Sequence, residues 1–359
     1  MTSFVSRGSF VDTKELIKDT ELFSQQWTKD TLGEVLGDTV ESVVRFLAAR
    51  GLVLNGVVCH WCCKECTLVD APRKQDGLMW QCACRQTRLS LRTGPYFRLP
   101  LSLRCLVLIL HQWSVETPSR LLSEQLGMTC ESVASAYATL RRLCREWNAT
   151  FPLKLGGCRS DQDERWQKVD VAICDLNARS DMRAFVAVER TTNRCFATTI
   201  ADLLPNTVSK IIHASIRPKT YVISRHFDDA AYFPEGTYRL RVPDPEHNRE
   251  DKVHARNIRK LCKRIDQFVR SQHSAEERDE YLHITEDFLA EFTWRSRFTE
   301  DFLAEFTWRS RFTEDFLAEF TWRSRFQERS NMFARVIDCL RRLYPVQTRY
   351  IRMAQRLSA

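Results

Sequence analysis

The sequence contains no run of apolar residues that could cross a bilayer. A membrane-spanning helix needs about 20 predominantly apolar residues, whereas the strongest candidate, residues 101–110, is interrupted by Ser102 and Arg104. The N-terminal residues also lack the apolar stretch of a signal peptide, and Asp12 and Glu15 argue against a transit peptide. We therefore expect a protein that is neither embedded in a membrane nor secreted.

Acidic residues are fewer than basic ones. The 46 Asp and Glu residues against 54 Lys and Arg residues give a formal net charge of +8. Such a surplus suits a polyanionic partner, but it also occurs in basic proteins that bind no polyanion. Apolar residues make up 43% of the chain, an ordinary share that predicts a packed core.

Cysteine, by contrast, is plentiful. There are 14 cysteines, and because the chain is long and carries no secretion signal, we interpret them as thiols in a reducing compartment. One cluster falls between residues 59 and 84, where two turns carrying Cys pairs supply the four-ligand tetrahedron of structural zinc. A set of buried free thiols is the alternative, and Cys63 and Cys66 offer a competing pair of ligands. The predicted zinc ligands are Cys59, Cys62, Cys82 and Cys84.

Apolar residues with helical spacing occur before and after the cysteines. The first such stretch is 31–50, and three more, 101–113, 117–126 and 130–147, follow with a tight turn at Gly127. A helix, a glycine turn and a longer basic helix form the pattern of a helix-turn-helix, whose last helix can lie in the major groove of DNA. An ordinary helical bundle shows the same spacing. The basic residues of the last stretch that we expect to contact DNA are Arg141, Arg142 and Arg145.

The middle of the chain alternates between strand-like and helix-like patterns. Strand-like stretches at Val169–Asp175, Ala184–Arg190 and Cys195–Ile200 precede a helical stretch, Thr207–Ile216, and a fourth strand, Thr220–Ser224. This is the element order of a ribonuclease-H-like core. In such cores, paired carboxylates at the strand ends hold two metal ions for phosphoryl chemistry.

A strongly basic helical stretch covers residues 251–270. Few acidic residues balance it locally, so it is a candidate for phosphate contacts, although a solvated helix face is the alternative. The residues that we expect to contact DNA are Lys252, Arg256, Lys260, Lys263 and Arg264.

A 14-residue segment then occurs three times without a difference, at Thr285–Phe298, Thr299–Phe312 and Thr313–Phe326. Fourteen residues make about four helical turns, so successive copies present nearly the same face. We expect one copy to fit the core, whereas the others expose Phe and Trp unless they fold back or meet a partner. A tandem duplication of a coding segment without a gained role is the simpler interpretation.

Four stretches of the chain carry motifs in a recognisable order and spacing. They are the cysteine cluster with Asp76-Gly77 and Trp80 running into Ser90–Phe97, the helix end Leu140–Cys144, the strand end Val188-Glu189-Arg190, and His254–Ile258 followed by Phe288–Arg295. Together, over roughly residues 20–340, these stretches resemble the Merlin-type DDE transposases and their bacterial insertion-sequence relatives. The resemblance implies a ribonuclease-H-like core with three metal-binding acids.

The chain departs from that family at the three acidic positions. By the resemblance, the catalytic positions correspond to Ala172, Arg225 and Arg259. A pair of divalent ions needs several oxygen ligands, whereas an arginine repels the metal and cannot lose its proton. A shifted register could bring in other acids. The candidates are Asp170 or Asp175, Asp228 or Asp229, and Glu246 or Glu250, with Asp170, Asp228 and Glu250 as the preferred set.

We therefore expect an α+β protein with a zinc ribbon and a helix-turn-helix-like helical domain, followed by a ribonuclease-H-like mixed sheet with flanking helices and a long C-terminal helical region. The expected segments are an N-terminal helical arm (1–50), the ribbon (51–98), the helical domain (99–150), a degenerate transposase core (165–298), the triple repeat (285–326), and a C-terminal helix with a basic tail (327–359).

The expected function is that of a nuclear, transposon-derived protein that binds DNA or chromatin and has lost catalysis. It would carry structural zinc and no magnesium or manganese. Two alternatives stay open. One is an active DDE transposase that uses the shifted carboxylates, and the other is a protein-interaction scaffold that binds a partner or itself through the repeated Phe/Trp helix.

Overall fold

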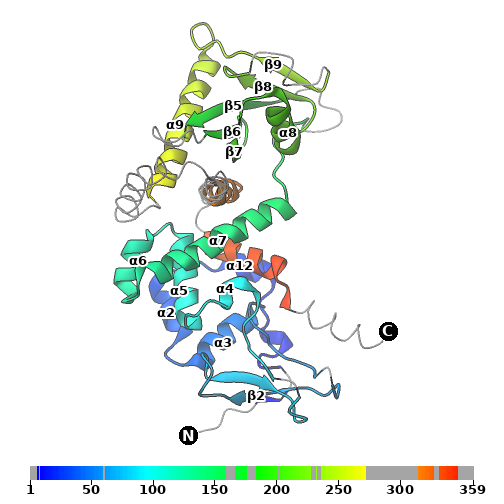
Figure 1. Cartoon of the computed structure of the whole chain (residues 1–359), viewed down its shortest axis with the longest axis vertical. Coiled ribbons are helices and arrows are strands. Elements are labelled where there is room, and N and C mark those ends of the chain that lie inside the picture. The colour runs from blue at the N-terminus through cyan, green and yellow to red at the C-terminus, as the bar shows by residue number, and fades with distance from the viewer. Residues whose placement is uncertain are drawn as a thin grey trace, which may run out of the picture. The chain divides into compact units, whose positions relative to one another are not determined.

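The computed structural model describes residues 6–7, 9–59, 61–86, 88–158, 166–175, 183–200, 202–227, 232, 236–271, 314–326 and 331–346. The chain divides into two compact units, Met1–Leu143 together with Glu328–Ala359, and Cys144–Gln327 (Figure 1). Within the described ranges, no helix has both the length and the apolar character that a membrane span requires.

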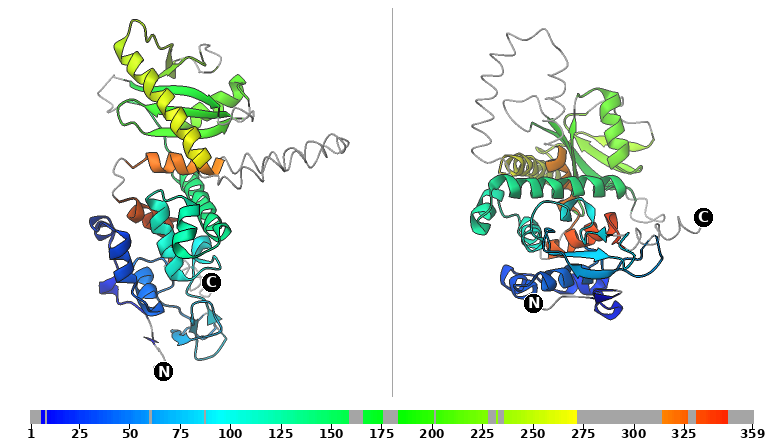
Figure 2. Two further views of the ribbon diagram at one scale, coloured as in Figure 1. Left: turned by 90° about the vertical axis from the view of Figure 1, so that its left-hand side faces the viewer. Right: turned by 60° about the horizontal axis from the view of Figure 1, so that its bottom comes forward.

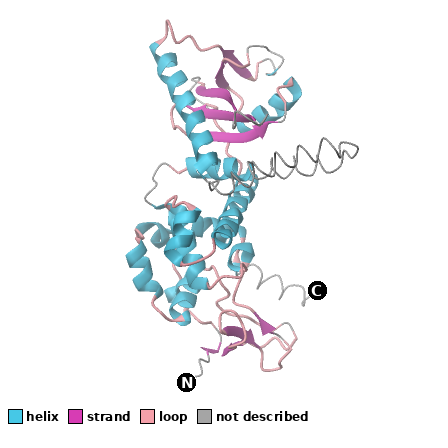
Figure 3. Cartoon of the chain, turned by 60° about the vertical axis from the view of Figure 1, so that its left-hand side comes forward, coloured by secondary structure: helices cyan, strands magenta, loops and turns pink. Residues whose placement is uncertain are grey.

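The first unit contains a small antiparallel sheet, which Figure 3 shows in magenta near the N-terminus. Its strands run in the order β1 (Ser6–Arg7), β2 (Thr67–Asp70), β3 (Leu78–Gln81) and β4 (Arg88–Leu89). Trp80 of β3 is fully buried, and its indole N–H donates to the Leu54 carbonyl at 3.2 Å. The sheet therefore presents one apolar face to the rest of its unit.

The remainder of the first unit is helical. Its elements are η1 (Thr13–Glu15), α1 (Asp19–Ser24), α2 (Lys29–Leu36), α3 (Val40–Ala49), α4 (Gly94–Phe97), α5 (Leu103–Ser114), α6 (Ser119–Leu126), the first part of α7 (Cys130–Thr150) and α12 (Met332–Leu343). Helix α5 is central and contacts α2, α3 and α12. Leu106, Leu110 and Trp113 of α5 are buried, so this apolar helix holds the core of the unit together.

The helix predicted over residues 31–50 is interrupted, and this prediction was wrong as a single element. Helix α2 ends before Gly37, which adopts a φ of +54° that favours glycine. Thr39 then accepts a hydrogen bond from the Ser42 N–H at 3.1 Å and starts α3 as its N-cap. The three helices expected after residue 100 are confirmed, and Gly127 ends α6 in the left-handed conformation.

The second unit is built on a mixed five-stranded sheet (Figure 3). Its strands are β5 (Gln167–Asp175), β6 (Arg183–Glu189), β7 (Cys195–Ile200), β8 (Thr220–Ser224) and β9 (Tyr238–Arg241), in the spatial order β7-β6-β5-β8-β9. Strands β5, β6 and β7 pair antiparallel, whereas β8 is parallel to both β5 and β9. The predicted strands Cys195–Ile200 and Thr220–Ser224 are confirmed at both ends.

Helices cover both faces of this sheet (Figures 1 and 2). Alternate residues of a strand point to opposite faces. Val169, Val171 and Phe185 pack against α8 (Pro205–Ser215). On the other face, the core residues Cys174, Ala184, Val186 and Ala197 pack against α9 (Arg249–Ser271) and against a helix over residues 314–324. The second unit is thus a three-layer α/β/α arrangement.

The helix over residues 314–324 belongs to the third copy of the repeat, and it docks on the outer strand β7. Trp322 is buried, and the Thr321 hydroxyl donates to the Ala197 carbonyl at 3.1 Å while accepting from the Ala197 N–H at 3.0 Å. Ser324 makes the same pair of contacts with Cys195. The prediction that one copy packs into the core is confirmed for this copy, and the first two copies lie outside the described residues.

Two cysteines in the second unit form a disulfide, so the interpretation of all cysteines as thiols was wrong for this pair. Cys174 of β5 and Cys262 of α9 are 88 residues apart in sequence, but their Cα atoms are 5.7 Å apart. That separation lies within the bonding range of a disulfide. A contact over such a sequence distance has no local signal. The other cysteines, all of them among the described residues, form no disulfide.

Candidate functional site

The four cysteines predicted as zinc ligands come together at one end of the β2–β3 hairpin. Their sulfur atoms all lie within 4.8 Å of one another, with 3.5 Å between Cys59 and Cys84 and 3.2 Å between Cys62 and Cys82. A tetrahedral zinc ion with Zn–S distances of about 2.3 Å places its sulfurs roughly 3.8 Å apart. The quartet therefore fits a structural zinc ion.

The local backbone explains why these four cysteines converge. The Cys59 N–H donates to the Lys64 carbonyl and the Cys63 N–H to the Cys59 carbonyl, which folds the first pair into a tight turn. Cys63 occupies the left-handed region at φ 57° and is exposed. Cys66 is buried nearby, and burial raises the pKa of its thiol, but it is not part of the quartet.

A buried ion pair joins the ribbon to the segment that follows it. Arg92 donates to both carboxylate oxygens of Asp76, at 2.7 and 2.6 Å, and its other N–H groups reach the carbonyls of Phe97, Leu99 and Leu101. All five guanidinium donors are used. Asp76 and Arg92 belong to the motifs that carry the resemblance, but no role was predicted for them. In the structure, their ion pair and the hydrogen bonds of Arg92 hold the segment 97–101 against the ribbon.

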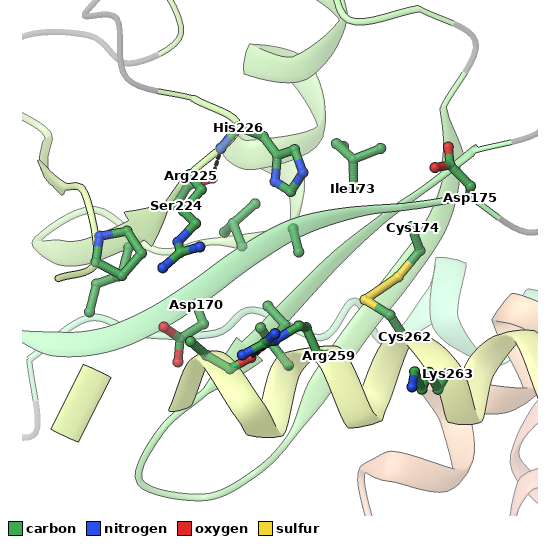
Figure 4. A pocket seen from close by; sticks show the side chains of 16 residues that line it. Asp170, Ile173, Cys174, Asp175, Ser224, Arg225, His226, Arg259, Cys262 and Lys263 are labelled. Atoms are coloured by element: carbon green, nitrogen blue, oxygen red, sulfur yellow. Dashed lines mark hydrogen bonds between the residues drawn. A yellow bond between two sulfur atoms is a disulfide. The ribbon is translucent and has the colours of Figure 1, made fainter. Parts of the chain in front are cut away.

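In the second unit, the three positions that the resemblance aligned with catalytic acids meet at one cavity. Ala172 lies on β5, Arg225 directly follows β8, and Arg259 lies on α9, and all three line a cavity of about 560 Å³ (Figure 4). Strands β5 and β8 are parallel, so their carboxyl ends meet at the same edge of the sheet, where open α/β sheets bind ligands. We call this cavity the basic corner.

The charge of the basic corner is positive. Its lining includes three cations, Arg225, Arg259 and Lys263, and two acids, Asp170 and Asp175. Among the described residues the two acids form ion pairs with Arg190 and Arg183, and no carboxylate forms an ion pair with any of the three cations. The corner also contains His226. Partial burial lowers the pKa of this imidazole, Asp175 raises it, and Arg225 lowers it further, so His226 is neutral at pH 7. Asp175 itself is largely exposed and lies 3.6 Å from Arg183.

The nearest acids surround a guanidinium and not an open metal site. Asp170 accepts from Arg190 Nε at 2.8 Å and from Arg190 Nη2 at 2.7 Å, and the Arg190 side chain is only 4% exposed. Arg190 Nη1 also contacts Glu250 at 3.1 Å and the fully buried Asp251 at 3.2 Å. Lys168 donates to Glu250 at 2.8 Å, and Arg241 contacts Asp251. We call this group the Arg190 cluster.

The acids proposed as replacements are therefore only partly brought together. Asp170 and Glu250 both contact Arg190, which supplies the positive charge that a metal would have supplied. Asp228 and Asp229 lie outside the described residues, and Glu246 is exposed. Within the part of the chain that the structure describes, the cysteine quartet is the one group of three or more His, Cys, Asp or Glu residues that could hold a metal. In the sequence, Arg190 stood out only as part of a motif. Its four hydrogen bonds to three carboxylates were not predicted.

The predicted DNA contacts differ in their accessibility. Arg141 is 5% exposed and cannot reach a phosphate, so we remove it from the candidate interface. Arg145 forms an ion pair with Asp315 at 2.6 Å. Arg142 is exposed. The five predicted contacts on α9 are also all exposed, and no ion pair of theirs is found among the described residues. They are Lys252, Arg256, Lys260, Lys263 and Arg264.

The basic corner and the exposed face of α9 together form a cationic surface within one unit. Such a surface attracts phosphates. Asp170 and Asp175 also line the corner, but Arg190 contacts both oxygens of Asp170 and Arg183 lies near Asp175, so the lining offers a divalent ion no cluster of unengaged carboxylates. A comparison of the chain with models of known protein families and with curated proteins found no match.

Proposed function

We propose that this chain is a transposase-derived protein that binds DNA or chromatin and does not cut it. The observation that carries the proposal is the basic corner. Two arginines and an alanine line the cavity at which a ribonuclease-H-like core would seat its metal ions. The chain order of three antiparallel strands, a helix and a fourth strand that pairs parallel with the first also supports such a core.

The exposed face of α9 supports the binding half of the proposal. Lys252, Arg256, Lys260 and Lys263 lie on one helix without local acidic partners among the described residues, and the phosphate backbone supplies most of the affinity for such a surface. Helices α6 and α7 have the helix–turn–helix order, but with Arg141 buried and Arg145 paired, we place the main contacts on α9.

The test is a binding and cleavage assay on the full chain. We expect duplex DNA to bind with an affinity that falls steeply as salt rises from about 50 to 200 mM, because phosphate contacts release counterions. Supercoiled plasmid should remain intact with Mg²⁺ or Mn²⁺. Nicking that depends on either ion would contradict the loss of catalysis, and the absence of binding at low salt would contradict the DNA-binding role.

A matched pair of variants locates the interface. Arg256→Glu/Lys260→Glu reverses two charges on α9 and should weaken DNA binding by about a hundredfold or more, since each lost phosphate contact lowers the salt slope by about one. Lys154→Glu/Lys210→Glu makes the same charge change at two exposed lysines away from α9. Equal losses in both variants would show a non-specific effect of net charge.

A further inference from the structure

The basic corner has the wrong charge for a metal site but the right charge for an anion. Arg225 comes from the end of β8, whereas Arg259 and Lys263 come from α9, so two separate elements deliver cations to one cavity (Figure 4). The acids beside them do not cancel this charge, because Asp170 is occupied by Arg190 through both of its oxygens and Asp175 lies near Arg183. Like charges held around one cavity repel, and a bound anion relieves that repulsion.

The chemistry of the lining selects the kind of anion. A guanidinium is planar, stays charged, and matches two oxygens of a phosphate at once. Two arginines and a lysine around a cavity of about 560 Å³ leave room for a phosphate with its attached sugar. The neutral His226 adds an N–H donor at the same rim.

The surface leading to the basic corner follows one face of α9. Lys252, Arg256, Arg259 and Lys263 are spaced by four, three and four residues, which puts them on one face of a helix. At about 1.5 Å per residue the row is roughly 16 Å long. The last two members of the row belong to the lining of the corner, so a strand that follows the row would bring one of its phosphates to the cavity.

We propose that the basic corner binds a phosphate group directly, through Arg225, Arg259 and Lys263, without a divalent ion. This inference rests on the proposed DNA-binding function for one source of the phosphate, the backbone of a nucleic-acid strand. The other source with the same chemistry is a free phosphate monoester. In either case, the site that would hold metal ions in a nuclease is a phosphate receptor in this chain.

The first measurement uses inorganic phosphate, so that it does not depend on DNA binding. We expect the ³¹P resonance of millimolar phosphate to broaden with the wild-type chain in the presence of EDTA. Arg225→Ala/Arg259→Ala should lose this broadening. The matched control Lys252→Ala/Arg256→Ala removes two cations from the same helix row, outside the cavity, and should keep it. The proposal is overturned if the corner variant broadens the signal as the wild type does, or if broadening requires Mg²⁺.

The second measurement identifies the source. Duplex DNA binding is compared for the same variants over a range of salt concentrations. If the phosphate comes from a strand, both variants lose about two from the slope of log affinity against log salt. The other outcome is that only Lys252→Ala/Arg256→Ala loses DNA affinity, while Arg225→Ala/Arg259→Ala loses only the binding of inorganic phosphate. In that case the corner binds a free phosphate monoester. A chain that binds phosphate but no DNA refutes the proposed function and leaves the corner standing.

A charge-preserving variant separates binding from folding. Arg225→Lys/Arg259→Lys keeps both positive charges but not the paired N–H geometry, so it should retain weakened phosphate binding. Thermal unfolding of each variant is followed alongside. Loss of phosphate binding in the alanine variant and weakened binding in the lysine variant, both at an unchanged melting temperature, support direct contact, whereas wild-type binding by the alanine variant refutes it.

Discussion

Arg190 balances the charges at the centre of the second unit. Its side chain is almost fully buried and contacts Asp170, Glu250 and Asp251. Burial alone would lower the pKa of this guanidinium, but the hydrogen bonds that it donates to Asp170, Glu250 and Asp251, together with the negative charge of Asp170, raise it, so the group stays charged. A buried charge of this kind is tolerated only while its partners are present.

Replacement of Asp170 by alanine should therefore destabilise the chain strongly. The change leaves a buried guanidinium without its two-oxygen partner, which costs about 3 kcal/mol or more. The free energy of unfolding in urea measures it. The matched control is Glu246→Ala, an exposed acid that should change stability by less than about 0.5 kcal/mol. If Mg²⁺ stabilised the wild type and not Asp170→Ala, Asp170 would be a metal ligand instead.

Glu250 should make stability depend on pH in the acidic range. The hydrogen bond from Lys168 lowers the pKa of this carboxyl, burial raises it, and Arg190 lowers it further, with a net lowering. A folded-state pKa below the unfolded value means that the stabilisation is complete above about pH 4.5 and is lost as pH falls through the folded value. Unfolding curves between about pH 3 and 7 should show a shallower acid limb for Glu250→Gln than for the wild type. Parallel curves would contradict this.

Elements differ in how well the sequence predicted them. Strands β7 and β8 were predicted to the residue because short apolar runs bounded by polar turns leave little choice of ends. The break at Gly37 was missed because the apolar spacing continues through it, and only the Thr39 cap marks the new helix. The cysteine quartet was predicted because zinc dictates the spacing of its ligands within each turn.

The ribbon should hold about one zinc ion per chain, and the ion should depend on the quartet alone. Cys82→Ser removes a buried ligand and should reduce the zinc content, measured by atomic absorption, to near zero. Cys63→Ser changes an exposed cysteine next to the predicted ligand Cys62 and should leave zinc bound. Zinc loss in Cys63→Ser would instead favour the competing pair.

The disulfide between β5 and α9 should stabilise the second unit. It closes a loop of 88 residues, and opening such a loop costs about 2–4 kcal/mol. Cys174→Ser/Cys262→Ser should therefore lower the free energy of unfolding by that amount under oxidising conditions. With a reductant present, the wild type and the double variant should become equal. The control Cys158→Ser, a free thiol, should respond to neither change.

At the scale of the whole molecule, what escaped prediction is long-range. The Arg190 cluster joins Arg190 to Glu250 and Asp251, which are 60 and 61 positions away, and the third repeat copy contacts β7 across more than 120 positions. Local patterns carry no information on such pairs, since they report only the period and ends of each element. Three residues of the basic corner, Ala172, Arg225 and Arg259, were named from the sequence only because the resemblance supplied them, whereas Lys263 and His226 were not assigned to this site.

Deletion of residues 285–312, which removes two of the three identical copies, should leave the second unit folded. The third copy alone supplies the buried Phe316, Leu317 and Trp322. In this single-copy chain Trp322→Ala should cost about 3–5 kcal/mol, because a buried aromatic ring is lost and no identical segment can replace it. Thermal unfolding measures both variants. If the deletion itself abolishes the binding of a protein partner at an unchanged melting temperature, the repeat acts as an interaction scaffold.

Strand β7 is the outer strand on one side of the five-stranded sheet, and Thr321 and Ser324 occupy its backbone N–H and C=O groups. An uncovered outer strand is a template on which strands of other chains can pair. A chain that stopped before residue 314 would lack that cover. We therefore expect truncation before residue 314 to expose the edge of β7 and to promote aggregation. The last copy of the repeat covers this edge and prevents it from pairing with strands of other chains.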